Sequence, residues 1–325
     1  MNTQVSVKWS MLMIILFLFS CTEQKKPVVS KTKKVQQAKE SKFENKMIAT
    51  LDKGFFKAKF LPVPDKLIVT SENGKGLALY DFKEDAVQQL TSKDGAGVNP
   101  ILTPDNRYVV YQTHEFKNRR RVSSIIIQDL SEMTSETIVK DKRNIKLLGA
   151  DKDKVYYLDG DKVVAYNLTT KKKTVNPPGV TLAYTDNDLN LVLYKDGKYR
   201  ILNPNGKGNY IWVSLSPDKK KILYNKAGEG TFIADLNGKI LVDLGRLHAA
   251  KWDASGKWII GMDDYDDGNK YTKSDIIMVS ADGKIRKNLT KNSDIIALYP
   301  DIAPNDDKIV FHNEEGRVYL MQLKK

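Results

Sequence analysis

Residues 213–224 read VSLSPDKKKILY, and this stretch decides the fold. A short strand comes first, a Ser-Pro-Asp turn follows, and a run of bulky apolar residues begins a second strand. Proline presets φ for the first corner of a turn, and Asp favours the next corner. An apolar run directly after such a turn is typical of a strand that is buried on both faces. The stretch therefore predicts a β-hairpin at the centre of a sheet.

The same unit recurs along the chain, at residues 59–70, 98–111, 250–260 and 300–311. Units continue with a third strand that ends in a polar turn, as in IIMVSADG at 276–283, and then with a fourth strand. Four strands repeated at spacings of roughly 30–50 residues are typical of β-propeller blades. Helical repeats would need apolar residues at i, i+3 and i+4 over long stretches, and the sequence lacks these. The chain is therefore predicted to be an all-β propeller.

The number of blades follows from the leading turns, which lie near residues 64, 104, 151, 187, 217, 255 and 304. They predict seven four-stranded blades within one propeller domain at 47–325. The last blade has three strands before the chain ends, so Met47–Leu51 is expected to supply its fourth strand and close the ring. Without this closure the terminal sheets would expose open edges. The segment 181–209 is short for four strands, and a six-bladed ring is the alternative if it is not a blade.

These units resemble the WD40-like repeats of the TolB propeller family, whose blades carry a W/F-S-P-D-G-K turn and an I-Y-x-x-D-x-x-G third strand. The resemblance is strongest at residues 210–235 and 252–323. It weakens at 144–209, where the hairpins at 155–166 and 191–202 lack the Pro-Asp pair. TolB-type propellers have six blades, so the count of seven departs from the family. The resemblance implies a protein that works in a cell-envelope complex.

The first residues indicate export. Residues 9–20 (WSMLMIILFLFS) form an apolar run that is too short, at about 1.5 Å per residue, to cross a hydrocarbon core of about 30 Å. The run suits a signal peptide at 1–20. The sequence LFSC at 18–21 resembles the bacterial lipobox, which predicts cleavage before Cys21 and acylation of its thiol. The alternative is an ordinary secretory cut with Cys21 as a bystander. The residue after Cys21 is Thr22, not the Asp that retains lipoproteins in the inner membrane, and this favours the outer membrane.

Residues 21–46 are predicted to be a disordered tether, because they hold eight Lys and three Glu but almost no apolar bulk. Of the formal net charge of +13, the tether carries +5 and Lys8 of the signal peptide carries +1, which leaves +7 scattered over the propeller. The lysines of the tether would lie near anionic lipid headgroups. Nucleic acid is not an expected partner, because no basic run alternates with aromatic residues.

A search for catalytic motifs finds none. Cys21 is the one cysteine, so no disulfide is expected, and no G-x-S-x-G nucleophile motif occurs. The three histidines, His114, His248 and His312, do not share a metal-binding spacing and are expected to be ordinary loop or strand-end residues. The sequence therefore predicts no catalytic residue and no cofactor.

Two charged loops are weak candidate sites. The acidic run at 263–269 carries four carboxylates that resemble calcium ligands but do not match the EF-hand register: Asp263, Asp264, Asp266 and Asp267. The basic run at 117–121 would grip an acidic glycan or a protein through Arg119, Arg120 and Arg121. For both runs a solvated loop is the favoured interpretation.

The aromatic residues are also uneven in their distribution. The aromatic side chains on leading and second strands are expected to pack between blades rather than to bind sugar: Tyr210, Trp212, Trp252, Trp258 and Tyr299.

Together these features predict a non-catalytic cell-envelope lipoprotein that binds a protein or glycan partner through one propeller face. The competing hypothesis is an envelope polysaccharide lyase or glycan hydrolase with its site in the central funnel. Ionisable side chains that converge on the funnel from several blades would favour the enzyme. A funnel lined by Lys and small polar residues would favour binding. A third hypothesis is a purely structural role in a larger envelope complex.

Overall fold

A computed structural model describes residues 46–325, except 53, 62–64, 306 and 324–325. The chain separates into two compact units, residues 1–35 and 36–325, and all described residues belong to the second. The predicted signal peptide, Cys21 and the predicted tether up to residue 45 lie outside the described residues. No helix in the described part of the chain is long and apolar enough to span a membrane.

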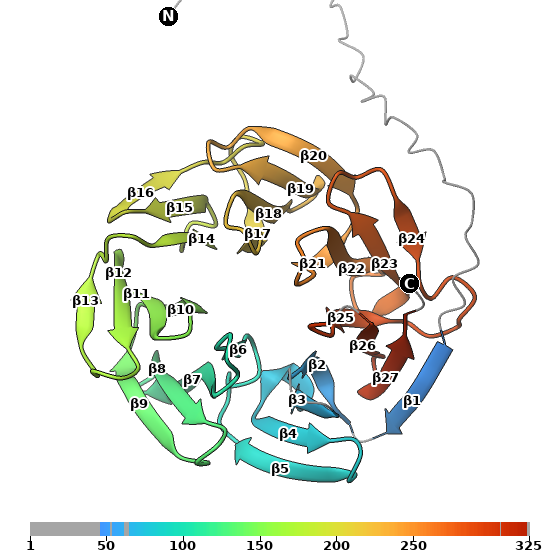
Figure 1. The fold of residues 1–325 in the computed structure, drawn as a ribbon, viewed down its shortest axis with the longest axis horizontal. Coiled ribbons are helices and arrows are strands. Elements are labelled where there is room, and N and C mark those ends of the chain that lie inside the picture. Colours follow the sequence, from blue (N-terminus) through green and yellow to red (C-terminus); the bar gives the residue numbers. More distant parts are fainter. Residues whose placement is uncertain (1–45, 53, 62–64, 306, 324–325) are drawn as a thin grey trace, which may run out of the picture. The chain divides into compact units, whose positions relative to one another are not determined.

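Seven antiparallel sheets are arranged in a ring and form a β-propeller, with their innermost strands around the axis where this fold has its central channel (Figure 1). Blade 1 contains β2 (Phe56–Phe60), β3 (Lys66–Thr70), β4 (Leu77–Asp81) and β5 (Ala86–Thr91), with the short 3-10 helix η1 (Glu72–Gly74) between β3 and β4. Blade 2 contains β6 (Ile101–Leu102), β7 (Tyr108–Lys117), β8 (Arg120–Asp129) and β9 (Ser135–Lys142). Blade 3 contains β10 (Ile145–Ala150), β11 (Lys154–Asp159), β12 (Lys162–Asn167) and β13 (Lys173–Val175).

The second half of the ring repeats this plan. Blade 4 contains β14 (Thr181–Thr185), β15 (Leu191–Lys195) and β16 (Lys198–Ile201). Blade 5 contains β17 (Tyr210–Leu215), β18 (Lys221–Lys226), β19 (Gly230–Asp235) and β20 (Ile240–Gly245). Blade 6 contains β21 (His248–Trp252), β22 (Trp258–Asp266), β23 (Tyr271–Ser280) and β24 (Arg286–Asn288). Blade 7 contains β25 (Leu298–Ile302), β26 (Lys308–His312), β27 (Arg317–Gln322) and β1 (Lys46–Asp52).

The ring closes as predicted. β1 pairs antiparallel with β27, with Met47 opposite Met321 and Asp52 opposite Arg317. The N-terminal strand therefore becomes the outermost strand of the last blade. The prediction of seven blades is confirmed, and the segment 181–209 does contain a blade, although its sheet has three strands.

The Ser/Thr-Pro-Asp motif builds the turn between the first two strands of a blade. Ser216 Oγ donates to Asp218 Oδ1 at 2.6 Å and accepts from the Lys221 amide at 2.9 Å. Thr103 Oγ1 makes the matching bond to Asp105 Oδ1 at 2.6 Å. Such side-chain bonds replace main-chain partners that a tight turn leaves unsatisfied. The local sequence is thus sufficient to specify this turn, without contacts from the rest of the blade.

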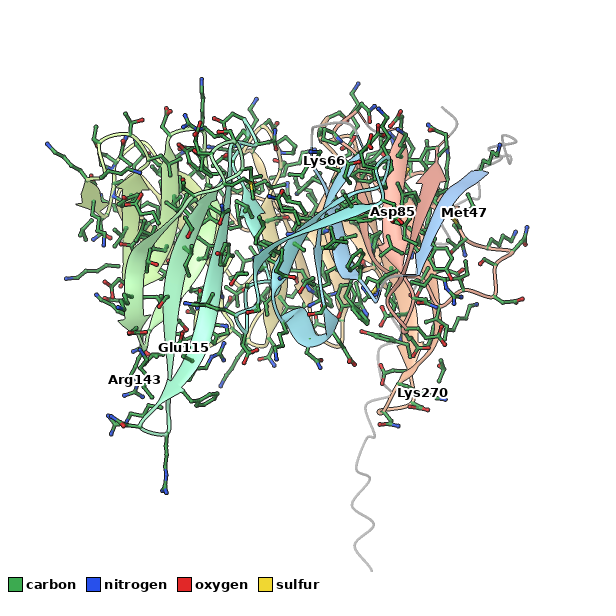
Figure 2. All side chains as sticks on the ribbon, turned by 90° about the horizontal axis from the view of Figure 1, so that it is seen from below. Met47, Lys66, Asp85, Glu115, Arg143 and Lys270 are labelled. Atoms are coloured by element: carbon green, nitrogen blue, oxygen red, sulfur yellow. The ribbon has the colours of Figure 1, made fainter. Side chains whose placement is uncertain are left out.

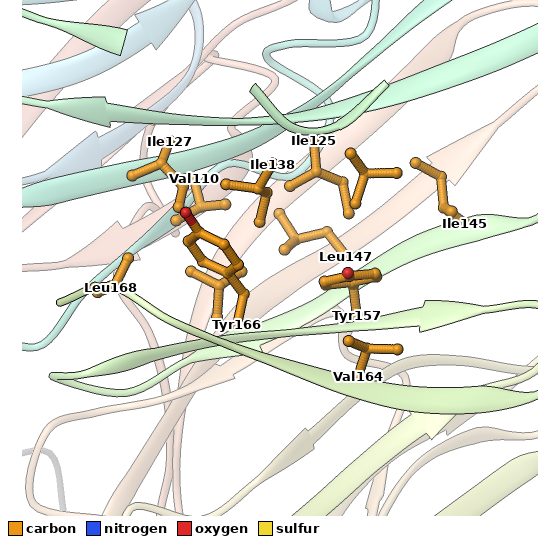
Figure 3. Close-up of a cluster of buried hydrophobic side chains, with 12 residues drawn as sticks. Val110, Ile125, Ile127, Ile138, Ile145, Leu147, Tyr157, Val164, Tyr166 and Leu168 are labelled. Carbon is orange, nitrogen blue, oxygen red and sulfur yellow. The ribbon is translucent and has the colours of Figure 1, made fainter. Parts of the chain in front are cut away.

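The core lies between neighbouring blades rather than inside one sheet. The buried side chains form seven clusters, one at each junction of two blades. At the junction of blades 2 and 3, Val110 and Ile125 face Leu147 and Tyr157 (Figure 3). Fully burying one such side chain contributes about 1.5–3 kcal/mol. The ring is therefore held together mainly by packing from blade to blade.

The two ends of the ring differ in their projections. The hairpins β7–β8 and β22–β23 extend beyond the sheets at one end, which carries Glu115 and Lys270 (Figure 2). Lys66 and Asp85, which adjoin other turns, lie at the opposite end (Figure 2).

Candidate functional site

One extra residue interrupts the pairing with the next strand in five innermost strands: β2, β10, β17, β21 and β25. In the four adjacent blades 5, 6, 7 and 1 the bulge holds a residue with positive φ, between 47° and 50°, which the bulge of β10 does not: Lys57, Trp212, Ala249 and Tyr299. Such a conformation costs a non-glycine residue about 1–3 kcal/mol. A bulge redirects the side chain that it carries, so the same redirection is repeated in blades 5, 6, 7 and 1.

Trp212 is the most accessible of these residues. Its side chain is 38% exposed, and its ring centroid lies 5.5 Å from that of His248 on blade 6. The His248 Nδ1 atom lies 2.8 Å from Oδ1 of the buried Asp264. Because a carboxylate only accepts hydrogen bonds, the proton on Nδ1 faces Asp264, and Nε2 is turned away from the carboxylate. An oriented imidazole thus stands beside an exposed indole at the end of β21 that is nearer the β22–β23 hairpin.

A second aromatic side chain is paired with a cation on blade 6. The Arg246 guanidinium lies 4.2 Å from the ring centroid of Tyr265, which is 47% exposed. Arg246 also donates to the Asp264 carbonyl at 3.1 Å, and its own carbonyl accepts from Arg286 at 2.7 Å. These bonds hold the guanidinium in place. A cation over an aromatic face contributes about 0.5–1 kcal/mol at an exposed site.

The aromatic residues continue across blades 7 and 1. The Tyr299 ring stacks on His312 at a centroid distance of 5.7 Å, and Lys57 Nζ lies 5.1 Å from the Tyr299 centroid. The Tyr271 and Tyr299 hydroxyls are 3.4 Å apart. Burial lowers the pKa of His312 to about 4. We name the set that spans blades 5, 6, 7 and 1 the mouth band: Lys57, Trp212, Arg246, His248, Tyr265, Tyr271 and Tyr299.

Next to the bulges, charged side chains join one blade to the next. Lys251 Nζ lies 2.8 Å from Asp301 Oδ1, and Asp301 Oδ2 accepts from the Phe60 amide at 3.0 Å. Lys59 Nζ donates to the Pro100 carbonyl at 2.8 Å. Burial, and next the charge of Lys251, lower the pKa of Lys59 to about 8. These ionisable groups come from several blades, but they are engaged in linking blades 6, 7, 1 and 2.

The acidic run does not gather into one site. Asp263 and Asp264 are neighbours on β22 and therefore point to opposite faces of the sheet. Asp266 accepts from the Gly268 amide at 2.9 Å, and Asp267 accepts from the Asn269 amide at 2.9 Å. Within the described ranges, no three His, Cys, Asp or Glu side chains are placed together to hold a metal ion.

Asp263 has a different environment from its neighbours. Its Oδ2 lies 3.9 Å from an Arg286 nitrogen, while burial raises the pKa of its carboxyl. This side chain packs beside Arg286 and away from Asp264, which orients His248. The single acidic residue of the run that contributes to the mouth band is therefore Asp264.

The basic run lies at the tip of the β7–β8 hairpin. Asn118 and Arg119 both have positive φ, 49° and 62°, which is the geometry of a two-residue hairpin turn. Arg119, Arg120 and Arg121 are all exposed. One Arg121 nitrogen lies 2.6 Å from His114 Nε2. Burial, and next the charge of Arg121, lower the pKa of His114. The tip therefore combines cations with Phe116, whose side chain is 77% exposed.

Sequence reasoning placed the aromatic residues only in part. Tyr210 is fully buried between blades, as predicted. Trp212 also packs against the next blade, through His248, but its side chain stays 38% exposed. His248 was expected to be an ordinary strand-end residue, and it instead pairs with Asp264. No local sequence signal marks either position, because the first depends on the register of β17 against β18 and the second on the pairing of β21 with β22.

Comparisons with known proteins agree on the fold. No family model and no curated protein matches the sequence, so the resemblance to the TolB family stays a prediction. Among solved structures, an oligogalacturonate lyase from Vibrio parahaemolyticus is 14% identical, with a TM-score of 0.56 over 87% of this chain and 97% of that one. An oligogalacturonate lyase in complex with manganese is 16% identical, with a TM-score of 0.56 over 87% and 96%.

A third structure of the same architecture is the β-propeller domain of Cps50 (Swd1) from Myceliophteria thermophila. It is 12% identical, with a TM-score of 0.61 over 86% of this chain and all of that one. At these identities the likeness establishes the β-propeller fold alone, and the neighbours span both enzymes and WD40 proteins.

Proposed function

We propose that this protein is a non-catalytic lipoprotein of the cell envelope, anchored through Cys21, which binds an acidic glycan at the mouth band. The observation that carries the proposal is the set of four equivalent bulges. They hold Trp212 and Tyr299 in a left-handed conformation, at a cost in backbone strain. Strain that is repeated at one place is a reason to infer a binding role.

The chemistry of the band supports a sugar with negative groups. Flat aromatic faces pack against the apolar faces of sugar rings, while Arg246 and Lys57 supply positive charge. Trp, Tyr and Arg are also the side chains that dominate binding energies at interfaces. Two structural neighbours are named as lyases of oligogalacturonate, an acidic glycan. Such a ligand therefore serves as the first probe.

The test is calorimetric titration with oligogalacturonate and with an uncharged oligosaccharide of the same length. We expect binding of the acidic glycan and a loss of at least about tenfold in affinity in Trp212→Ala, since a central aromatic anchor is worth about 1.4 kcal/mol or more. Phe116→Ala is the matched control, because it removes an exposed aromatic residue outside the band. Equal losses in both variants, or no binding of the acidic glycan, would contradict the proposal.

A lyase is the second candidate, and the His248–Asp264 pair is the observation that favours it. An imidazole whose Nδ1 is oriented by a carboxylate is a suitable general base. In such a reaction, His248 Nε2 would take the proton α to a uronate carboxylate, and the glycosidic C–O bond would break with the leaving oxygen gaining a proton. Formation of unsaturated uronate, detected by its ultraviolet absorbance and lost in His248→Ala, would replace the non-catalytic proposal.

A further inference from the structure

Blade 4 ends one strand early. Its sheet has the order β14-β15-β16 from the channel outward, whereas the other six described sheets have four strands (Figure 1). No strand of the described chain pairs with the outer edge of β16. An outer strand of blades 3 and 5, β13 or β20, lies on either side. A strand added to β16 would therefore complete the wall of the ring.

The main chain of β16 presents hydrogen-bonding groups at this edge. The Leu202 amide donates to the Leu191 carbonyl at 2.9 Å, and Arg200 lies opposite Leu193 in the same register. In an antiparallel pair, bonded and non-bonded positions alternate. Residues 198, 200 and 202 therefore bond to β15, while the N–H and C=O groups of Tyr199 and Ile201 point outward.

The chain that follows β16 does not cover this edge. Asn205 accepts from the Tyr224 hydroxyl at 2.6 Å, and the Gly206 carbonyl accepts from the Tyr210 hydroxyl at 2.8 Å. These contacts hold the segment against the inner strands of blade 5. The side chains of Tyr199 and Ile201 are 65% and 53% exposed. The edge is thus both accessible and partly apolar.

Charge decides what fits the edge. The β15–β16 hairpin carries Lys195, Lys198 and Arg200 against Asp196. A second copy of the chain would pair antiparallel with this edge, through a two-fold axis normal to the sheet. Odd-numbered residues would then lie opposite odd-numbered residues, and even-numbered residues opposite even-numbered ones. Centred on Tyr199, such pairing sets Lys198 opposite Arg200, and centred on Arg200 it sets two arginines opposite each other. Like charges directly opposite each other destabilise a sheet.

The Lys-rich segment at 21–45 is disfavoured for the same reason, because it would add further positive charge. We propose that the outer edge of β16 binds an acidic, extended segment of another protein as the fourth strand of blade 4. The main chain of Tyr199 and Ile201 would pair with the segment, and Lys198 would contact its carboxylates. This is strand addition at a sheet edge. It is independent of the mouth band, which lies on blades 5, 6, 7 and 1.

The experiment measures amide hydrogen exchange of the whole protein with two short peptides, one alternating Val with Glu and the other alternating Val with Lys. We expect the acidic peptide to slow exchange at Tyr199 and Ile201 several-fold and the basic peptide to leave it unchanged. The amides of β5, the outer strand of a complete blade, are the internal control. Protection by both peptides alike, equal protection in β5, or no protection at Tyr199 and Ile201 would overturn the proposal.

Two variants keep the test independent of folding. Tyr199→Pro removes one outward N–H and leaves the bonds to β15 in place, and it is expected to abolish the protection of Ile201. Lys195→Glu combined with Lys198→Glu is expected to switch the preference to the basic peptide. Sedimentation that shows a dimer which Tyr199→Pro dissolves would overturn the acidic partner in favour of a second copy.

Discussion

Blades 5, 6, 7 and 1 differ from blade 4 in two features. The four blades have bulged inner strands and complete sheets, whereas β14 pairs with β15 without a register shift and blade 4 lacks a fourth strand. Blade 4 also lacks the Pro-Asp turn that blades 1 and 5 have. Its Asp186 instead accepts from the Asp188 and Asn190 amides at 3.0 and 2.8 Å. A blade can therefore use a different turn and lack its outer strand, and still keep its place in the ring.

The reason is that the junctions between blades are built mainly from the inner and middle strands, although some outer-strand residues, such as Ile138 and Val139 of β9 and Leu244 of β20, also join them. Leu191 and Leu193 of blade 4 pack against Tyr210 and Ile222 of blade 5 through the inner and middle strands. The outer strands are mostly exposed, as in β5 and β13. Blades 5, 6, 7 and 1 can therefore carry the mouth band, while blade 4 leaves a sheet edge open on the outside of the ring.

The largest expected effect tests whether blade 4 is packed as tightly as its neighbours. Leu191→Ala in blade 4 and Leu223→Ala in blade 5 each remove a fully buried side chain. Both are expected to lower the free energy of unfolding by about 2–5 kcal/mol. The midpoint of denaturant unfolding measures the loss. A much smaller loss in Leu191→Ala would show that blade 4 is packed less tightly than blade 5, against the expectation of equal packing.

The next effect concerns pH and is expected in the bulged half of the ring. Burial lowers the pKa of His312 to about 4, below its value in the unfolded chain, so the unfolded state binds the extra proton first. Stability is therefore expected to fall as the pH drops from about 6.5 to about 4, by roughly 3 kcal/mol from this group.

Melting temperatures across this pH range measure the change. His312→Asn, whose amide can donate to the Asn313 carbonyl in place of Nδ1, should flatten the pH dependence. An unchanged profile in this variant would assign the pH dependence to other groups.

A smaller effect separates the two kinds of turn. Asp186→Ala in blade 4 removes the acceptor of two amides, and Asp218→Ala in blade 5 removes the acceptor of the Ser216 hydroxyl and one amide. Each is expected to cost about 0.5–2 kcal/mol, as the loss of a helix cap does.

Asp186→Ala should be the more costly change, since no proline presets that turn. Thermal unfolding of the two variants side by side gives the order. A larger loss in Asp218→Ala would mean that Pro217 does not compensate for the missing carboxylate.

The smallest expected effect is the change in stability when an inner-strand alanine becomes glycine, and its sign is opposite in a bulged strand and in a regular one. Ala249→Gly relieves a left-handed residue in the bulge of β21 and is expected to stabilise the protein by up to about 1 kcal/mol. Ala183→Gly in the regular strand β14 is expected to destabilise it by about 0.5–1 kcal/mol. Chemical denaturation resolves this difference. A loss of stability in both variants would show that the bulge carries no strain.

Much of the fold was predictable from single stretches of sequence. The third strand at 77–81, the hairpins at 155–166 and 191–202 and the closing strand at Met47–Leu51 were all expected, and the structure contains each of them. The exposure of Trp212 and the pairing of His248 with Asp264 were not predicted. The first depends on the bulge in the pairing of β17 with β18, and the second on the side chains that the pairing of β21 with β22 brings together.

The sequence alone determined the hairpins, their turns and the number of blades, because strand alternation and Ser/Thr-Pro-Asp chemistry act over a few neighbouring residues. Only the tertiary structure decided where the mouth band lies and which sheet edge stays open. A bulge depends on the register with the adjacent strand, and the channel mouth exists only once β1 has closed the ring on β27. The closing pair joins residues from opposite ends of the chain, and a bulge depends on two strands at once, so no single stretch of sequence encodes either.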